Sequence, residues 1–407
     1  MKARLFKKLG IALGAVALVF CLLYFAVLPA SRVFAMPDNM IIYSSDIGYI
    51  NQNRVFGQFV NVELKKSSVP VVKAPDVGEV EFKLFNLIPI KTHKVVIGED
   101  EVLAGGMPVG LVISAEGALI VGSSVIETDG NTFDITKSGL KVGDIITHIE
   151  DEKVENTGSI SKFINKKENG GRELKITAMR KNKEYEFRVK PAYDIKSDSF
   201  KLGVWVRDDA SGIGTLTFID DKNRFGALGH PICDGDTGVM MAVKSGNLYG
   251  CNILGLNKGV AGDPGEIRGL FLQGKNSQGH IDKNSEFGVF GEISQNSLLL
   301  DQTLKLKVGG RLTVSPGKAQ IRSAVDGNLK LYDIEIIKTN YQNYQNDRSM
   351  VIRIIDPELL EKTGGIIQGM SGSPIIQNGK LVGAVTHVFV NDPTKGFGVY
   401  MDWMLGQ

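Results

Sequence analysis

The stretch QGMSGSPIIQNGKLVGAVTH (residues 368–387) holds two serines one residue apart, several glycines and a late histidine. Its second half predicts a strand, an Asn-Gly-Lys turn and a second strand, because apolar runs flank a dipeptide typical of tight turns. Glycines beside a serine let the backbone turn sharply and present N–H groups to a substrate. The stretch therefore predicts either a plain glycine-rich hairpin or one that exposes a catalytic serine.

The segment GMSGSP (369–374) resembles the G-D-S-G-G-P element of chymotrypsin-like proteases, and the hairpin that follows continues the resemblance. This register implies that Ser371 is the nucleophile and that Ser373 is structural. It also implies that the N–H groups of Gly369 and Ser371 form the oxyanion hole that serine hydrolysis needs. Met370 stands where that family has Asp, so activation through a salt bridge to a new N-terminus is not expected.

A general base is expected far upstream of this serine. The segment GIGTLTFIDDKNRFGALGHPI (212–232) predicts a strand, a polar turn and a second strand before His230, the plan that precedes the base in chymotrypsin-like enzymes. His387 is the rival base, but in this register it lies beside the specificity pocket, which favours a pocket-wall or core histidine. His93 and His280 have no motif around them and are expected at the surface.

Two carboxylates are candidates for the group that orients the histidine. Asp263 lies 33 residues after His230 in a glycine-rich turn, and Asp356 lies 15 residues before Ser371. The spacing from the histidine favours Asp263.

The three cysteines predict no disulfide framework, because Cys233 and Cys251 form no CxxC pair and Cys21 lies in an apolar run. One bridge between Cys233 and Cys251 stays open. The segment HPICDGD (230–236) has the spacing H-x2-C-x2-D, but a zinc site usually has four protein ligands with a second close pair. We therefore expect no metal and no cofactor.

Residues 98–192 are expected to form a compact module. Within it, GLKVGDIITHIEDEKVEN (139–156) resembles the strand-turn-strand of PDZ domains attached to bacterial extracytoplasmic proteases. Such domains bind an extended peptide as an added strand, with its carboxylate at backbone N–H groups. The alternative is a small module without a peptide site.

The resemblance to PDZ domains implies positions for the peptide groove. Val109, Gly110 and Leu111 would form the carboxylate-binding loop before the strand. Phe163 would lie on the other wall, a helix expected over residues 159–167, where apolar side chains share one helical face.

The N-terminus has four basic residues followed by an uncharged run over residues 9–30. A run of about 20 apolar residues can span a bilayer, and a basic flank stays in the cytoplasm. Residues 1–35 are therefore expected to be a transmembrane anchor helix that leaves the rest of the chain extracytoplasmic. Val33-Phe34-Ala35 resembles a cleavage site, so a secretory signal peptide is the alternative.

The rest of the chain predicts a mainly β protein. Residues 36–97 hold β-rich runs and a linker-like segment, KKSSVPVVKAPDVG (65–78), which is expected to be exposed and cleavable. Over residues 195–407, strands and glycine turns alternate, which suits an all-β domain of the two-barrel or sandwich kind. The net charge of +2 gives no case for nucleic acid binding.

Taken together, these features resemble peptidase family S55 along essentially the whole chain. The resemblance is carried by GALGHPICDGDTG, IIDPELLEKTGG, QGMSGSP and AVTHVFVNDPTKGFGVYMDWML. At the matching positions the family's histidine is His230, its serine is Ser371 and its proposed acid is Asp356. The resemblance alone favours Asp356 over Asp263, and it implies a PDZ domain followed by a chymotrypsin-like protease domain of two barrels.

The resemblance also implies a function. The chain is similar to a signalling serine endopeptidase of sporulation that is located in the forespore intermembrane space. The substrates implied by the resemblance are the protein itself and a membrane-bound regulator of an intramembrane protease. Release of that protease would activate a late mother-cell sigma factor. Two alternatives are a catalytically inactive PDZ and protease-like scaffold, and a general extracytoplasmic quality-control protease.

Overall fold

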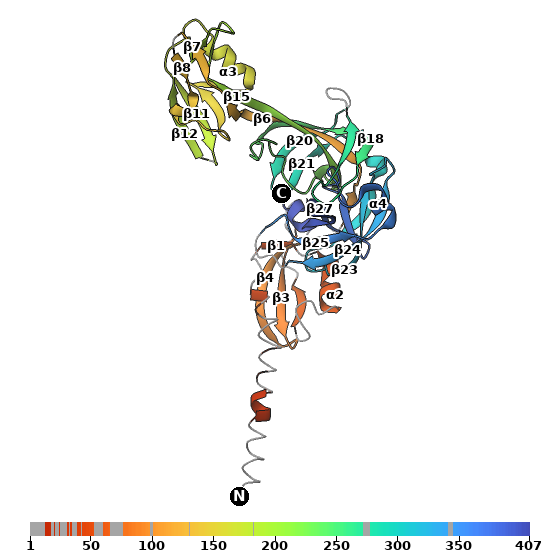
Figure 1. The fold of residues 1–407 in the computed structure, drawn as a ribbon. Helices are drawn as coiled ribbons and strands as arrows, with labels where there is room; N and C mark the ends of the chain where they lie inside the picture. Colours follow the sequence, from red (N-terminus) through yellow and green to blue (C-terminus); the bar gives the residue numbers. More distant parts are fainter. Residues whose placement is uncertain are drawn as a thin grey trace.

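The computed structural model describes residues 13–17, 20, 24, 31, 33–34, 39–41, 43–52, 60–65, 76–97, 101–129, 131–181, 183–271, 277–340 and 345–407. Figure 1 shows three parts: a small N-terminal sheet, a large body, and a lobe at the end of a long two-stranded ribbon. Strands dominate all three parts, so the prediction of a mainly β protein is confirmed.

The N-terminal sheet has four strands in the order β1-β4-β3-β2. Its elements are β1 (Asn39–Ile41), α2 (Ser44–Gln52), β2 (Val60–Lys65), β3 (Asp76–Leu84) and β4 (Ile88–Ile97). Asp46 of α2 attaches the sheet to the body, because it accepts the N–H of Gly310 at 2.8 Å and pairs with Lys380 at 2.8 Å. His93, expected at the surface, is buried edge-on against Phe82.

Most of the predicted membrane anchor, residues 9–30, lies outside the described residues, as does most of the linker-like segment 65–78. Among the residues that the structure does describe, no helix has the length and apolar character needed to cross a bilayer.

The body holds two hydrophobic cores within one continuous network of paired strands. Two cores are what a two-barrel arrangement requires. The first core lies among β6 (Pro108–Ser123), β15 (Val204–Ile219), β16 (Arg224–Ala227), β17 (Val243–Gly250), β20 (Ser277–Ser285) and β21 (Gly288–Ile293).

The second core is larger and includes the C-terminal strands. It lies among β5 (Glu101–Ala104), β22 (Leu304–Val308), β23 (Gly317–Ser323), β24 (Lys330–Thr339), β25 (Met350–Ile354), α4 (Pro357–Thr363), β26 (Pro374–Gln377), β27 (Lys380–Phe389), β28 (Asp392–Tyr400) and α5 (Met401–Leu405). The hairpin of β26 and β27 is the one predicted after the serine motif, with its turn at Asn378-Gly379.

The ribbon of Figure 1 consists of β6 and β15, which are 16 residues long each and run antiparallel from the body into the lobe. Their pairing extends from Pro108 opposite Thr215 to Ser123 opposite Val204. The lobe is therefore inserted into a hairpin of the body. It comprises residues 118–206, and residues 101–115 belong to the body, which corrects the predicted module boundary at residue 98.

The structure contradicts the predicted role of Val109, Gly110 and Leu111. All three are buried in β6, where Leu111 pairs with Gly212 of β15 on one side and with Leu248 of β17 on the other. A central strand has both edges occupied, so it cannot accept a peptide as an added strand. The expectation that these residues form a carboxylate-binding loop is wrong.

The lobe contains the helix α3 (Thr157–Ile164). This helix overlaps the helix predicted over residues 159–167, but it begins and ends earlier. Asn156 caps its N-terminus by accepting the N–H of Ser159. Phe163 is buried in the lobe core and does not line a groove. The other elements of the lobe are the short helix η1 (Ile135–Ser138) and the strands β7 (Ile126–Thr128), β8 (Asn131–Phe133), β9 (Ile145–Ile149), β10 (Glu152–Lys153), β11 (Leu174–Arg180), β12 (Lys183–Val189), β13 (Ala192–Asp194) and β14 (Ser199–Lys201).

Asp144, the last residue of the GLKVGD pattern, holds the turn of that pattern in place. Its side chain is 1% exposed and accepts two bonds from Arg180, at 2.6 and 2.7 Å, and one from the N–H of Lys141 at 2.9 Å. Arg180 also donates to the carbonyl of Gly139 at 2.8 Å. The turn of the motif is therefore closed by one buried, bidentate ion pair.

Arg180→Met is expected to destabilise the lobe by about 3–5 kcal/mol, because it leaves the Asp144 carboxylate buried without its counter-charge. The measurement is hydrogen exchange of the lobe amides against urea concentration. Arg188→Met is the matched control, since the pair of Arg188 with Glu173 spans 3.7 Å and is largely exposed, and should cost less than about 1 kcal/mol. Equal losses in the two variants would contradict this account.

Candidate active site

The loop that carries the predicted nucleophile spans residues 368–373. Some of its backbone N–H groups donate hydrogen bonds within the chain and others do not. The N–H groups of Gln368, Met370, Gly372 and Ser373 all donate to carbonyls of the chain. Those of Gly369 and Ser371 donate to no acceptor within the described residues. These two are the donors that the sequence assigns to an oxyanion hole, and they are available for one.

β15 holds this loop against the first core. The N–H of Thr215 donates to the carbonyl of Ser371 at 2.9 Å, and the Thr215 hydroxyl donates to the carbonyl of Gly369 at 2.8 Å. The Thr217 hydroxyl, which is fully buried, donates to the carbonyl of Gly372 at 2.8 Å. Three bonds from one strand therefore set the backbone of the nucleophile loop.

The two serines of the motif have different surroundings. Ser371 is half-buried, and its Oγ donates to the carbonyl of Thr386 on β27 at 2.7 Å. Ser373 is fully buried, and its Oγ contacts the hydroxyl of Ser323 at 3.4 Å. A substrate could reach only Ser371.

Gly372 is where the nucleophile loop meets the histidine segment. Its φ is +94°, and a Cβ there would lie 2.1 Å from the carbonyl oxygen of Thr215 and 2.5 Å from the nitrogen of Leu228. Leu228 is two residues before His230, so the two predicted catalytic segments are packed backbone to backbone at this position. Only glycine permits that approach.

His230 follows β16, and its ring is held by a hydrogen bond to the backbone of the next residue. Its Nδ1 lies 2.9 Å from the carbonyl oxygen of Pro231. Because a carbonyl only accepts, Nδ1 carries the proton and Nε2 has the free lone pair. Burial lowers the pKa of His230 below its ordinary value of 6.5, which keeps the imidazole neutral near pH 7. A neutral imidazole with a free Nε2 is a competent general base.

His387 lies next to His230, which the sequence did not indicate. The centroids of the two rings are 5.0 Å apart and their planes differ by 36°. Burial, followed by the neighbouring His230, lowers the pKa of His387. The register of the hairpin had placed His387 only at the wall of a pocket.

The structure brings neither predicted acid to His230. Asp356 is the N-cap of α4: one carboxylate oxygen accepts the N–H of Leu359 at 3.0 Å and the other that of Asp333 at 3.2 Å. Asp263 accepts the N–H of Gly265 in the turn of a hairpin made by β18 (Asn252–Asn257) and β19 (Glu266–Leu270). No hydrogen bond or ion pair joins either to His230 in the described part of the chain.

The carboxylate that does lie beside the histidines belongs to Asp347, between β24 and β25. Its Oδ2 is 3.6 Å from Nδ1 of His387. No motif surrounds Asp347 in the sequence, and it lies 117 residues from His230 and 24 from Ser371. Sequence reasoning had no signal that could have identified it.

The segment after His230 is a salt-bridged loop. Asp234 is buried and accepts the N–H groups of Asp236 and Thr237 at 3.1 and 2.9 Å. Arg207 of β15 binds both Asp234 and Asp236. Cys233 is exposed, Cys251 is half-buried, and both are free thiols. The disulfide that the sequence left open is therefore not formed.

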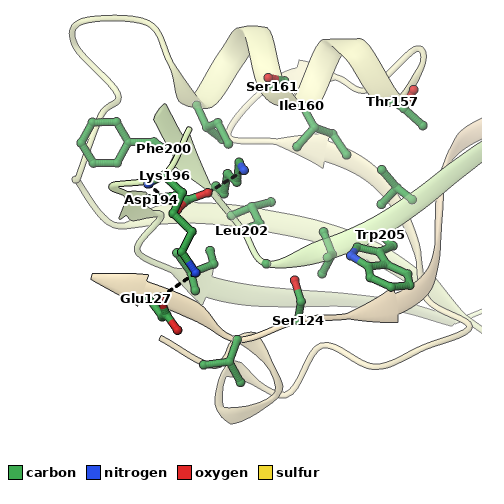
Figure 2. Close-up of a pocket in the computed structure, with 17 residues that line it drawn as sticks. Ser124, Glu127, Thr157, Ile160, Ser161, Asp194, Lys196, Phe200, Leu202 and Trp205 are labelled. Atoms are coloured by element: carbon green, nitrogen blue, oxygen red, sulfur yellow. Dashed lines mark hydrogen bonds and ion pairs between the residues drawn. The ribbon is translucent and has the colours of Figure 1, made fainter. Parts of the chain in front are cut away.

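A groove of about 450 Å³ lies in the lobe between α3 and the start of β15. Figure 2 shows Ile160 and Ser161 on one wall, and Leu202 and Trp205 on the other. The N–H groups of Leu202 and Gly203 donate to no acceptor within the described residues. On the side away from β6, the edge of Val204–Val206 pairs with no described strand.

This groove has the features that the sequence sought at residues 108–111. It has an open strand edge, a helix opposite that edge, free N–H groups in the loop before the strand, and an apolar lining. The sequence pattern that marks it is Phe200-Lys201-Leu202-Gly203-Val204, which lies after the module boundary that the sequence analysis had set at 192.

Two family models match parts of the chain. The family model described as SpoIVB peptidase S55 matches residues 198–405, and the model of the PDZ domain matches residues 130–190. A search of curated proteins found no match.

Solved structures similar to parts of the chain include a PDZ domain and two proteases. The PDZ domain of the SdrC-like protein of Listeria monocytogenes is 19% identical, over 23% of this chain and 90% of that one, with a TM-score of 0.19. The Rv3671c protease of M. tuberculosis in its active form is 15% identical over 49% and 73%, with a TM-score of 0.27. The HtrA-type protease AlgW with a decapeptide is 13% identical over 49% and 52%, with a TM-score of 0.28.

Gly372→Ala is expected to destabilise the body by at least about 3 kcal/mol, because strain at positive φ adds to a backbone clash with β15 and Leu228. Gly379→Ala is the control: its φ is +73° but the space around it is open, so only the backbone strain of about 1–2 kcal/mol applies. Calorimetric unfolding of the two variants measures the difference. Similar melting temperatures would refute the packing argument.

Proposed function

Because the chain belongs to the SpoIVB peptidase S55 family, we propose that Ser371 and His230 are the catalytic pair of this serine endopeptidase. The observation that carries the assignment is the nucleophile loop itself. Within the described residues, the N–H groups of Gly369 and Ser371 donate to no acceptor, while carbonyls of the loop are bonded to β15. The loop also packs directly on the segment that carries His230.

Each group has a defined task in the proposed reaction. The Ser371 hydroxyl exchanges its bond to Thr386 for one to Nε2 of His230, transfers its proton there and attacks the substrate carbonyl carbon. The N–H groups of Gly369 and Ser371 bind the oxygen that becomes negative. His230 then returns the proton to the leaving amine, and water hydrolyses the acyl-enzyme by the same steps.

We propose that the groove between α3 and β15 is the peptide-binding site of the PDZ domain. The free N–H groups of Leu202 and Gly203 suit a carboxylate, and the open edge of Val204–Val206 suits an added strand. Apolar side chains, among them Ile160 and Ile164, line the groove. The expected ligand is therefore an extended peptide that ends in an apolar residue with a free carboxylate.

The finer biological role is also a proposal. The resemblance along the whole chain supports a regulatory protease of sporulation that acts outside the cytoplasm, with the basic and apolar N-terminus as its membrane attachment. Its proposed substrates are its own segment 65–78 and a membrane-bound regulator of an intramembrane protease. A general quality-control protease would instead digest many unfolded proteins, and an inactive scaffold would digest none.

Ser371→Ala is expected to lower kcat/KM for peptide hydrolysis by more than about 1,000-fold, because the nucleophile is lost. Ser373→Ala, the matched control, should stay within about tenfold of wild type, since the one side-chain partner of its hydroxyl among the described residues is the buried Ser323. Mass spectrometry of the N-terminus in both variants reports self-cleavage. Unchanged hydrolysis and self-cleavage in Ser371→Ala would overturn the assignment.

Ser161→Trp is expected to weaken binding of a labelled decapeptide with an apolar C-terminal residue by at least about tenfold, because the indole fills the groove. Lys162→Trp is the matched control, being exposed on the same helix but outside the groove. Fluorescence polarisation measures both, and amidation of the peptide should weaken binding to wild type. Equal affinity of the two variants would place the peptide elsewhere.

A further inference from the structure

His230 has no carboxylate partner in the described part of the chain. When it takes the proton of Ser371 it becomes an imidazolium in a buried position, where an unbalanced charge is costly. Its Nδ1 donates to the carbonyl of Pro231, a neutral acceptor. Serine hydrolases usually supply a negative charge to the protonated histidine, so the source of that charge has to be found among the neighbours of the ring.

The neighbour of His230 is His387, and the neighbour of His387 is Asp347. The rings of the two histidines are 5.0 Å apart, and Oδ2 of Asp347 is 3.6 Å from Nδ1 of His387. That Nδ1 is buried and has no hydrogen-bond partner among the residues that the structure describes. The contact needs to shorten by only about 0.6 Å to become a hydrogen bond, and catalytic hydrogen bonds are often long before substrate binds.

The loop that carries Asp347 is held in place. The backbone carbonyl of Asp347 accepts the hydroxyl of Thr386 at 3.4 Å, so Asp347 is tied to the residue whose own carbonyl binds Ser371. Next to it, Asn346 accepts the N–H of Arg348 at 2.8 Å and the hydroxyl of Ser349 at 3.1 Å. The Asp347 side chain is 26% exposed, so its charge is only partly screened by solvent.

Of the residues that the structure describes, three charged or titratable ones face His387. His230 approaches from the segment after β16, and Asp347 and Arg348 approach from the loop before β25. His230 and Arg348 disfavour the protonated form of His387, and Asp347 favours it. Asp347 also favours the protonated form of His230. Within the described residues, Asp347 is the carboxylate that favours the protonated form of both rings.

We propose that Asp347, acting through His387, is the positioning carboxylate of this active site. It holds His387 with its Nδ1 proton toward the carboxylate, and the pair supplies the negative potential that stabilises the imidazolium form of His230. The inference rests on the proposed function, because it takes His230 to be the base. It leaves Asp356 as a helix cap whose two oxygens are already bonded to backbone.

The first test is the pH dependence of kcat/KM. The base must be neutral, so wild-type activity is expected to fall as the pH falls through the lowered pKa of His230, with a midpoint below 6.5. Asp347→Asn removes the charge that raises this pKa, so the midpoint should move to still lower pH and the maximal kcat/KM should drop by about tenfold or more. Asp347→Glu should restore part of both.

Asp356→Asn is the matched control, because Asn caps helices about as well as Asp. It should keep the wild-type midpoint and stay within a few-fold of the wild-type rate. If Asp356→Asn collapses activity while Asp347→Asn does not, the inference is overturned. If wild type is no more active than Ser371→Ala, the proposed function itself fails, which is a distinguishable result.

A second test does not depend on turnover. The chain has five histidines, so their ring signals can be followed by NMR titration in the Ser371→Ala background. Asp347→Asn should lower the pKa of both His230 and His387, while the ring signals of His93, His148 and His280 should match those of the Ser371→Ala parent. A titration in which neither His230 nor His387 shifts would exclude Asp347 as the source of the charge.

Discussion

The strand β15 is the constraint on which the rest of this molecule depends. Its first residues form the open edge of the lobe groove, and Arg207, the fourth residue of the strand, binds the loop that follows His230. Thr215 and Thr217 near its end bind the nucleophile loop. Groove, histidine segment and nucleophile loop are thus fastened to one continuous piece of backbone. Their relative positions follow from the length and register of that strand, with no flexible linker between them.

The candidate active site lies where the two cores of the body meet. Each core contributes what the other lacks: the first carries His230, and the second carries Ser371, His387 and Asp347. The close approach at Gly372 keeps the two halves in contact. Because the groups come from four separate stretches of chain, the site forms only when both cores are packed, and it has a histidine pair where a single histidine was expected.

Local patterns predicted local features well. The serine hairpin, helix α3 and the GLKVGD turn are each formed by contiguous residues, so the pattern of those residues predicts their conformation. The same reasoning could not predict long-range strand pairing. The apolar run at 109–113 fits a strand of the lobe as well as a buried strand of the body. Its pairing with β15 and β17 shows that it belongs to the body. The capping role of Asp356, by contrast, could have been predicted from the sequence, because Asp-Pro-Glu is a common start of a helix.

The insertion of the lobe into a hairpin bears on how the chain folds. Ser123 and Val204 lie directly opposite each other although 80 residues separate them in sequence. Bringing two such distant strands together costs loop-closure entropy, unless the intervening segment folds first and delivers its ends side by side. The lobe has a hydrophobic core of its own, which is what early folding of that segment requires. During synthesis it can therefore act as an internal folding template, one that seats β15 on β6 before the C-terminal half of the protein has left the ribosome.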